Sequence, residues 1–224
     1  MSNLVHLWAI FLGTVVALLP IINPLAAAPT FLAITEGDSD ALRREQARKG
    51  CFYMVAILVS SLIGGTFIMN FFGISIPGLR IAGGILMTGI GMSMLAAHHS
   101  TEEEMAEREA ARQKGDISFS PLAMPMLSGP GSIAVTLGFT SLATDWVDYG
   151  AIIAGIIVVA IITYLVLRLS GKIVRFIGPV GMNAMTKIMG FLIMCIGVQF
   201  VVNGVLGIAT DPELLRGIKS VLAR

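Results

Sequence analysis

The chain has 224 residues, of which 55% are hydrophobic and 13% are charged, and its mean hydropathy is +0.85. A soluble domain could not cover so much apolar side chain with polar surface, so the composition excludes a soluble globular protein. The formal net charge of +1 gives no reason to expect a nucleic-acid partner. We therefore expect a chain that is embedded in a lipid bilayer.

Six long stretches contain no Asp, Glu, Lys or Arg, and most are close to the roughly 20 residues that cross a bilayer as a helix. These stretches predict six transmembrane helices, and the segments between them hold the charges. The stretches are roughly 4–34, 51–72, 81–97, 119–142, 150–167 and 188–208.

The first stretch is too long for one straight helix. Residues 4–34 would extend about 46 Å at 1.5 Å per residue, whereas the hydrocarbon core is about 30 Å thick. The stretch also holds Pro20, Pro24 and Pro29, and each proline removes a backbone donor and clashes with the preceding turn. These features favour a broken or re-entrant helix over a simple kink.

The fourth stretch repeats this proline pattern. PLAMPMLSGPGSIAVT begins at Pro121 and PIINPLAAAPTFLAIT begins at Pro20, and in both the prolines stand four and then five residues apart. A matching threonine follows in each copy, Thr35 and Thr136. A second pair of motifs, RIAGGILM from Arg80 and KIMGFLIM from Lys187, opens the third and sixth stretches. Spans one to three therefore repeat as spans four to six.

Because three spans are an odd number, the second copy enters the membrane from the opposite face, as in many secondary transporters. The predicted fold is an all-α membrane protein with six transmembrane helices in two inverted three-helix repeats, in which helices 1 and 4 are broken. The expected parts are a first repeat at 1–97, a charged cytoplasmic loop at 98–118, a second repeat at 119–210 and a short tail at 211–224.

Lys and Arg residues predict the orientation in the cell inner membrane. The segments after the first, third and fifth stretches hold eleven of them, and the opposite side holds four. Cytoplasmic loops are enriched in Lys and Arg, so the first set should be cytoplasmic and both termini extracytoplasmic.

Two helix breaks would place partly charged backbone ends inside the membrane, positive at helix N-termini and negative at C-termini. Breaks related by inversion would meet near the midplane and form a polar site without a charged side chain. The candidate substrate-binding residues are Asn23, Pro24, Thr30, Ser128, Gly129, Gly131, Ser132 and Asn203.

Each candidate has a structural alternative. Asn23 could contact a ligand or cap the second half-helix. Gly129 and Gly131 could let the backbone approach a ligand, with a positive φ, or could serve close helix packing. The three hydroxyl candidates could instead bond carbonyls of their own helix. Asn203 and the nearby Gln199 should face the interior, where they could bind substrate or bridge helices.

Other residues are given structural roles. Gly89, Ser93 and Ala97 lie four apart in the third stretch and predict a helix-packing stripe. His98, His99 and the glutamates that follow are interpreted as a solvated loop rather than a metal site. No nucleotide-binding motif or nucleophile–base pair is present, and apart from His6 the stretches hold no group that titrates near neutral pH. We therefore expect neither an enzyme nor a resident cofactor.

The motifs NPLAAAPTFLAIT, RIAGGILM, PLAMPMLSGPGSIAVT and KIMGFLIM…VQFVVNG together resemble the MarC family of integral membrane proteins, which includes the SnatA-type small neutral amino acid transporters. The resemblance covers nearly the whole chain and implies six spans. For characterised members it implies transport of glycine, alanine and similar amino acids, whereas most members have no established substrate.

The sequence therefore predicts a secondary transporter of small zwitterionic amino acids: glycine, alanine and, as a further candidate, serine. A passive channel or facilitator, or an exporter of another small solute, is the alternative. The absence of carboxylates from the spans favours Na⁺ over H⁺ as a coupling ion, while a proton route through His6 or loop residues stays open. The direction of transport and the oligomeric state stay open.

Overall fold

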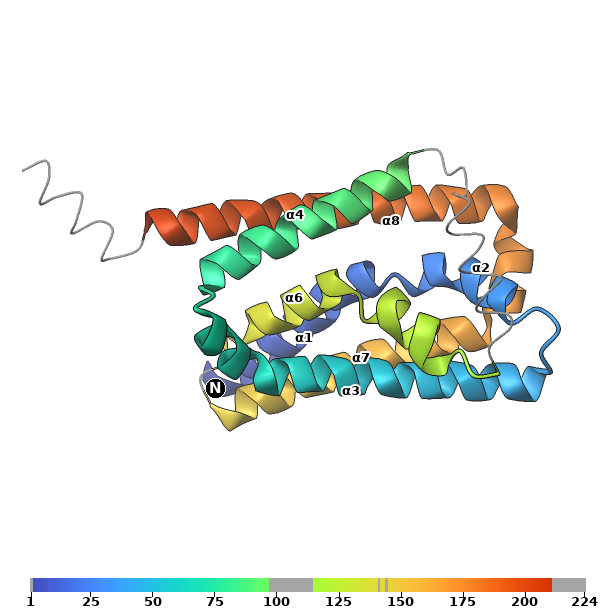
Figure 1. The fold of residues 1–224 in the computed structure, drawn as a ribbon, viewed down its shortest axis with the longest axis horizontal. Helices are drawn as coiled ribbons and strands as arrows, with labels where there is room; N and C mark the ends of the chain where they lie inside the picture. The colour runs from blue at the N-terminus through green and yellow to red at the C-terminus, as the bar shows by residue number, and fades with distance from the viewer. Residues whose placement is uncertain (1, 97–114, 141, 144, 211–224) are drawn as a thin grey trace, which may run out of the picture.

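The computed structural model describes residues 2–96, 115–140, 142–143 and 145–210, and all regular structure in these residues is helical (Figure 1). Most of the predicted charged loop at 98–118 and the tail at 211–224 lie outside the described residues. The elements are α1 (Ser2–Ile22), α2 (Pro24–Ile34), α3 (Asp40–Phe72), α4 (Ile76–Leu95), η1 (Ser118–Leu127), α6 (Pro130–Phe139), α7 (Trp146–Arg168) and α8 (Ser170–Ala209).

Within the described part of the chain, five helices are long and apolar enough to cross a bilayer. The bent pair η1 and α6 makes a sixth if it counts as one span. These helices confirm the prediction of an all-helical membrane protein. Their exposed large side chains include Phe67, Phe71 and Ile161, which are 73%, 72% and 52% exposed, as expected for surfaces that face lipid.

Successive spans run in alternating directions (Figure 1). We refer to the end of the bundle at which α1, α4 and α7 begin as the α1 end, and to the opposite end, at which α3, η1 and α8 begin, as the α3 end. The η1–α6 pair thus runs opposite to the α1–α2 pair.

Two of the helices extend beyond the predicted spans at the α3 end. α3 begins at Asp40, where Ser39 Oγ accepts from the Leu42 N–H at 3.2 Å and caps the helix. α8 begins at Ser170 and has a left-handed residue at Gly178, with φ 72° and ψ 169°. Charged residues that the sequence places in loops therefore lie on helices that continue out of the apolar region.

The helices α4 and α8 pack against each other backbone to backbone. Glycines seven residues apart face each other on the two helices, Gly84 opposite Gly197 and Gly91 opposite Gly190. Gly204, seven residues further along α8, lies against Pro77 and Ile81. A Cβ atom at Gly197 would lie 2.7 Å from the Gly84 carbonyl oxygen, and one at Gly190 would lie 3.0 Å from the Gly91 oxygen. Small residues permit this close approach between membrane helices.

The prediction that Gly89, Ser93 and Ala97 form the packing stripe is wrong. Gly89 and Ser93 are exposed, and nothing lies within 4 Å of a Cβ atom at Gly89, while Ala97 lies outside the described residues. The observed contacts repeat every seven residues because helices that cross at a small angle meet once every two turns. Small residues spaced four apart, such as Gly89 and Ser93, lie on a different face of α4 from the glycines that pack against α8.

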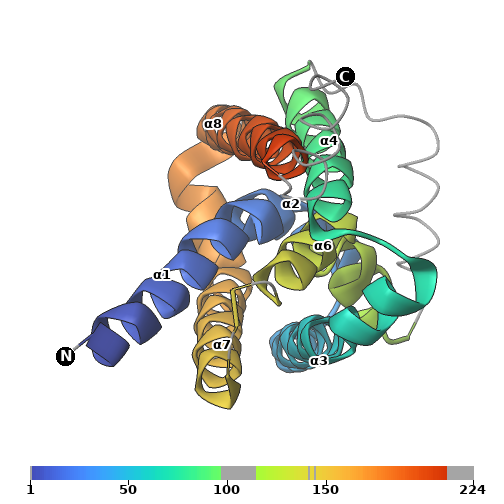
Figure 2. The same cartoon turned by 90° about the vertical axis from the view of Figure 1, so that its left-hand side faces the viewer.

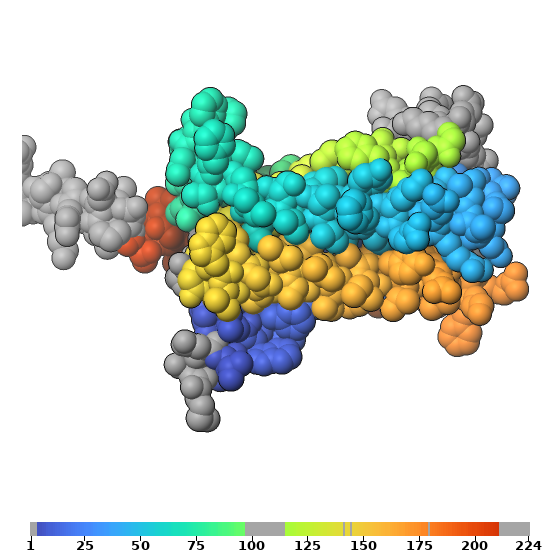
Figure 3. Space-filling view, turned by 90° about the horizontal axis from the view of Figure 1, so that it is seen from below, coloured from blue at the N-terminus to red at the C-terminus, as the bar shows by residue number. Residues whose placement is uncertain are grey.

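The remaining helices surround the second proline segment. α6 contacts α1, α3 and α4 and lies among them (Figure 2). α3 and α7 lie side by side over one face of the molecule (Figure 3). The break between η1 and α6 is therefore enclosed by protein on several sides.

The glycine contact between α4 and α8 predicts the effect of adding one methyl group. We expect Gly197→Ala to lower the free energy of unfolding by about 1–3 kcal/mol, because its Cβ would lie 2.6 Å from Thr88 Oγ1. Gly89→Ala is the matched control on the open face of α4 and should leave the melting temperature unchanged or slightly raised. Thermal unfolding in detergent measures both, and equal melting temperatures would contradict the packing.

Candidate functional site

The first helix break consists of a single residue, Asn23. Its backbone is left-handed, with φ 45° and ψ 63°, and it is the only non-glycine residue with a positive φ in the described ranges. Asparagine tolerates this conformation better than most residues. Its Oδ1 accepts from the Ala26 N–H at 3.3 Å and caps α2, and its Nδ2 lies 3.9 Å from Met94 Sδ on α4. The side chain is 6% exposed, so the predicted capping alternative is observed in a buried position.

The second proline segment departs from helical geometry at Ser120, at Met124 and at the junction of Ser128 and Gly129. Ser120, Met124 and Gly129 each directly precede a proline. Ser120 and Met124 have extended conformations inside η1, with φ near the β region at −130° and −132°. Gly129 is the N-cap of α6, with φ −68° and ψ 173°. A proline disfavours the helical conformation of the residue before it, which accounts for all three positions. The axes of η1 and α6 differ by 65°.

The breaks fall inside both predicted proline segments, but the two copies are not identical. Asn23 and Met124 occupy matching positions, directly before the second proline, and neither has helical backbone angles. Leu19 and Ala28 precede the other two prolines of the first copy and stay within α1 and α2. The first copy is therefore interrupted once and the second copy three times.

The two breaks lie against each other. Gly131, in the first turn of α6, is buried next to Ile21, in the last turn of α1, and Met87 of α4. A Cβ atom at Gly131 would lie 3.4 Å from Ile21 Cγ2 and 3.4 Å from Met87 Cγ. The chain ends of the two half-helices are thus brought together although they are about 100 residues apart in the sequence.

The expected positive φ at Gly129 or Gly131 is wrong. Neither glycine has one, and the left-handed residue at the breaks is Asn23. Space is the constraint instead, because a Cβ atom at Gly129 would lie 2.9 Å from the Pro125 carbonyl oxygen. The second break needs glycine for close backbone contact rather than for an unusual dihedral angle.

Two serines supply hydroxyl groups at the second break. Ser132 Oγ donates to the Leu127 carbonyl at 3.3 Å, which is the predicted structural alternative. Ser128 is fully buried, and its Oγ has no hydrogen-bond partner among the described residues. The N-terminus of α6 beside it has no side-chain cap. An unpartnered buried hydroxyl costs about 1–3 kcal/mol, which a ligand that bonds to it would recover.

Two cavities flank the paired breaks, one toward each end of the bundle. The cavity toward the α1 end has a volume of about 310 Å³, and its lining includes Ala17, Arg80, Val135, Gly138, Phe200 and Asn203. The cavity toward the α3 end has a volume of about 240 Å³, and its lining includes Leu19, Asn23, Pro24, Val166, Met189 and Leu192. The contact of Gly131 with Ile21 and Met87 closes the space between the two proline segments.

Most of the predicted substrate-binding residues gather at the breaks. These residues are Asn23, Pro24, Ser128, Gly129, Gly131 and Ser132. Thr30 is half-buried on α2, seven residues and about 10 Å beyond Asn23, so it is not brought to the breaks. Asn203 lines the cavity toward the α1 end instead.

The prediction that Asn203 and Gln199 face the interior is wrong. Both are exposed on α8, and Gln199 Nε2 donates to Asn203 Oδ1 at 2.9 Å, one helical turn away. The amides therefore satisfy each other along one helix instead of bridging two helices. Asn203 still reaches the cavity, because that cavity opens beside α8.

Sequence reasoning missed two charged residues. Arg80 lines the cavity toward the α1 end, although it had been interpreted only as the residue that opens the third span. Asp148 is 2% exposed in the first turn of α7, with its Oδ1 3.4 Å from His6 Nε2. Asp145, three residues earlier, accepts from the Val147 and Asp148 N–H groups at 3.1 Å. An N-cap signal at Asp145 could have shown that the helix begins before the uncharged stretch.

Comparisons with known proteins agree with the fold. A model of the MarC family integral membrane proteins matches residues 8–209. The inner membrane protein MarC of Salmonella paratyphi A is 42% identical over 211 residues, which covers 89% of this chain and 95% of the relative. The proteins of the same name from Citrobacter koseri and Escherichia coli O1:K1 / APEC are each 40% identical with the same coverage. No solved structure matches the chain.

The left-handed conformation of Asn23 predicts an order of stability for two variants. Asn23→Ala loses the cap and places a β-carbon in the left-handed region, so the free energy of unfolding should fall by about 1–3 kcal/mol. Asn23→Gly loses the cap without the steric strain, so its free energy of unfolding should fall by only a few tenths of a kcal/mol. Thermal unfolding ranks the two, and an alanine variant as stable as the glycine variant would contradict the geometry.

Proposed function

The chain belongs to the MarC family of integral membrane proteins, and we propose that it is a secondary transporter of small neutral amino acids in the inner membrane. The names of the relatives state the membrane and no substrate. The observation that carries the proposal is the chemistry at the paired breaks. There the unpartnered Ser128 hydroxyl and the uncapped α6 N-terminus lie in an interior without a charged side chain.

The backbone ends at the breaks fit a zwitterion. A helix N-terminus carries about half a positive charge and a C-terminus about half a negative charge. The α6 N-terminus would receive the substrate carboxylate, and carbonyl groups at the ends of α1 and η1 would receive the ammonium. A zwitterion brings no net charge into the membrane, whereas the side-chain ammonium of lysine would lack a carboxylate partner at a cost of several kcal/mol.

The space at the breaks favours the smallest amino acids. Gly129 and Gly131 are in close contact with backbone or side-chain atoms around them, and Ala27 and Ala28 line the first turns of α2. We expect glycine, alanine and serine to fit with small displacements of Ile21 and Met87, the side chains that lie next to Gly131. Tryptophan would have to separate α1 from α6.

Arg80 affects where along its path an anionic amino acid would be rejected. The cavity toward the α1 end has a guanidinium in its lining, so an anionic amino acid would not lack a basic residue on its way in. We place the rejection of glutamate at the breaks, where the described residues offer no basic side chain. Arg80 would instead attract the carboxylate group of any amino acid that enters this cavity.

We further propose that the two three-helix units, 1–97 and 119–210, are inverted repeats that alternate access to the site. The matched threonines behave alike, since Thr35 Oγ1 donates to the Phe31 carbonyl at 2.7 Å and Thr136 Oγ1 to the Ser132 carbonyl at 2.8 Å. The two cavities lie on opposite sides of the paired breaks. Rocking of one unit against the other would open one cavity to the breaks and close the other.

The proposal also names a coupling ion and an alternative to it. Sodium remains the proposed coupling ion, because it can use carbonyls and hydroxyls where no carboxylate is present. The buried Asp148 and the exposed His6, which pair at the α1 end, are the alternative route for a proton. Uptake driven by a pH gradient in sodium-free buffer, and lost in Asp148→Asn, would replace sodium by protons in this proposal.

Ser128 predicts opposite effects on stability and binding. Ser128→Ala should leave the ligand-free protein at least as stable, because it removes a buried hydroxyl without a partner. The same variant should lose most of its stabilisation by glycine and alanine. Ser93→Ala is the matched control, because Ser93 is exposed and donates to the Ile90 carbonyl at 2.8 Å. Thermal unfolding of purified protein with each amino acid measures both effects.

The expected ligand panel is specific. Glycine, alanine and serine should raise the melting temperature and show counterflow in proteoliposomes, whereas lysine, glutamate and tryptophan should do neither. Stabilisation by lysine or glutamate, with none by glycine or alanine, would contradict the proposed substrate class. Saturable uptake without counterflow would identify a passive facilitator instead of a transporter.

The orientation is testable at the α3 end. Basic residues of α3, α7 and α8 gather there, so we propose that this end is cytoplasmic and that both termini are extracytoplasmic. A cysteine at the exposed Arg48, in a background lacking Cys51 and Cys195, should react with an impermeant reagent only after the membrane is opened. Labelling from outside intact cells would reverse the orientation.

A further inference from the structure

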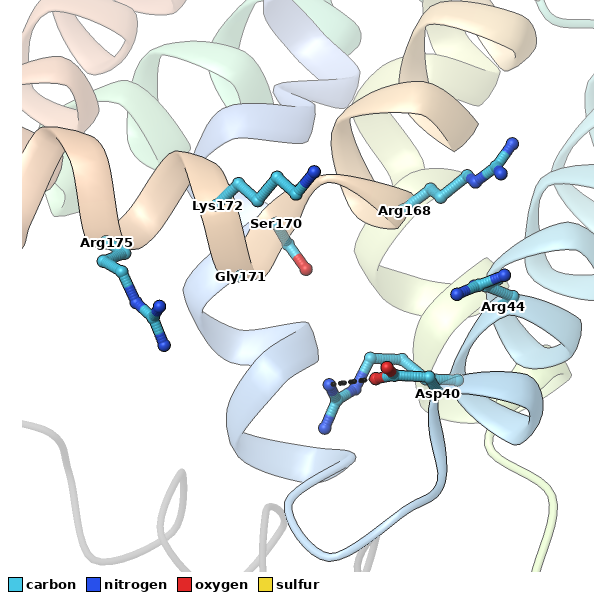
Figure 4. A pocket seen from close by; sticks show the side chains of 8 residues that line it. Asp40, Arg44, Arg168, Ser170, Gly171, Lys172 and Arg175 are labelled. Atoms are coloured by element: carbon cyan, nitrogen blue, oxygen red, sulfur yellow. Dashed lines mark ion pairs between the residues drawn. The ribbon is translucent and has the colours of Figure 1, made fainter.

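Five basic residues line one cavity at the α3 end of the bundle, with α3 on one side and the junction of α7 and α8 on the other (Figure 4). The cavity has a volume of about 380 Å³ and lies away from the helix breaks. Asp40 is the only acidic residue among the described residues of its lining. The basic residues are Arg43 and Arg44 of α3, Arg168 at the end of α7, and Lys172 and Arg175 at the start of α8.

Most of this positive charge has no carboxylate partner among the described residues. Arg43 has partners, because its Nε and Nη2 donate to Thr35 Oγ1 and the Thr35 carbonyl, each at 3.0 Å, and its Nη1 lies 3.7 Å from Asp40 Oδ1. The other four basic side chains lie beyond ion-pair distance of every carboxylate in the described residues. Like charges that converge in this way repel one another unless an anion lies between them.

Ser170 adds a second, independent feature. Its side chain is 1% exposed, and its Oγ has no hydrogen-bond partner in the described part of the chain. The hydroxyl points into the space between α3 and the start of α8 (Figure 4). The N-terminus of α8, whose first segment runs to the turn at Gly178, has no side-chain cap. A buried hydroxyl, an uncapped helix N-terminus and guanidinium groups are the donors that proteins use for phosphate oxygens.

We propose that this basic cavity binds a phosphate group, as the phosphodiester of an anionic lipid headgroup or as a soluble phosphate. Arginine side chains bind phosphate oxygens in a bidentate manner, and the cavity presents them from two sides. Its position where α3, α7 and α8 leave the apolar region is the depth at which lipid headgroups lie. The proposal does not depend on the transported substrate.

Occupancy of the cavity would connect the two three-helix units. Arg44 belongs to the first unit, whereas Arg168, Ser170 and Lys172 belong to the second. A phosphate group held by both sides would therefore draw α3 toward the junction of α7 and α8. Cytoplasmic loops that are basic only for orientation would have no need to place their charges around one cavity.

The test compares the thermal stability of the purified full chain under matched conditions. One arm uses phosphatidylcholine nanodiscs with and without phosphatidylglycerol, and the other adds inorganic phosphate against chloride at equal ionic strength. We expect phosphatidylglycerol, phosphate or both to raise the melting temperature. A response to phosphatidylglycerol alone identifies the headgroup, and a response to phosphate as well identifies a site open to soluble anions.

Three variants decide whether the effect comes from this cavity. Arg168→Gln should lose more than about half of the shift in melting temperature, because binding stabilises only the state that binds. Gly171→Asp should also lose it, since its Cβ would meet no atom within 4 Å and its carboxylate would repel the anion. Arg48→Gln, an exposed arginine of α3 outside the cavity, is the control and should keep the full shift. No shift with either probe, or equal shifts in Arg168→Gln and Arg48→Gln, would overturn the proposal.

Discussion

A backbone N–H or C=O group without a partner costs several kcal/mol in hydrocarbon, so a helix can be interrupted inside a membrane only where protein surrounds the break. Both breaks of this chain meet that condition. The Asn23 side chain caps α2 and lies against Met94 of α4. The break at Ser128 and Gly129 lies among α1, α3 and α4. The close glycine packing of α4 on α8 and the cover of α3 and α7 hold this enclosure together.

Much of this arrangement could be predicted from the sequence, because charge-free stretches and prolines act locally. The spans and the positions of the breaks follow from these two signals. The packing contacts and the exposure of individual side chains depend on which faces of the helices meet, and this is not a local property of the sequence. The packing glycines, such as Gly84 and Gly197, repeat every seven residues, and the exposed pair of Gln199 and Asn203 satisfies itself within one helix. Asp148 was missed because its helix begins before the uncharged stretch and buries a charged side chain.

The two ends of the bundle differ in chemistry, and the described residues place no charged side chain at the breaks between them. The α1 end holds the pair of His6 and Asp148 and the cavity with Arg80, and the α3 end holds the basic cavity around Ser170. A central site made from backbone ends would select a ligand without net charge. The charged side chains at the two ends would then influence the orientation of the protein in the membrane, the entry of the ligand and the contact with lipid headgroups. They would not contact the ligand at the central site.

If the two helix breaks serve to bind a small zwitterion, the ligand must lie between them. An experimental structure of the protein in lipid with glycine or alanine bound tests this directly. We expect a ligand between the two breaks, with its carboxylate at the N-terminus of α6 and within hydrogen-bond distance of Ser128 Oγ. A ligand bound elsewhere, or helices that run unbroken through Asn23 and Gly129, would contradict it.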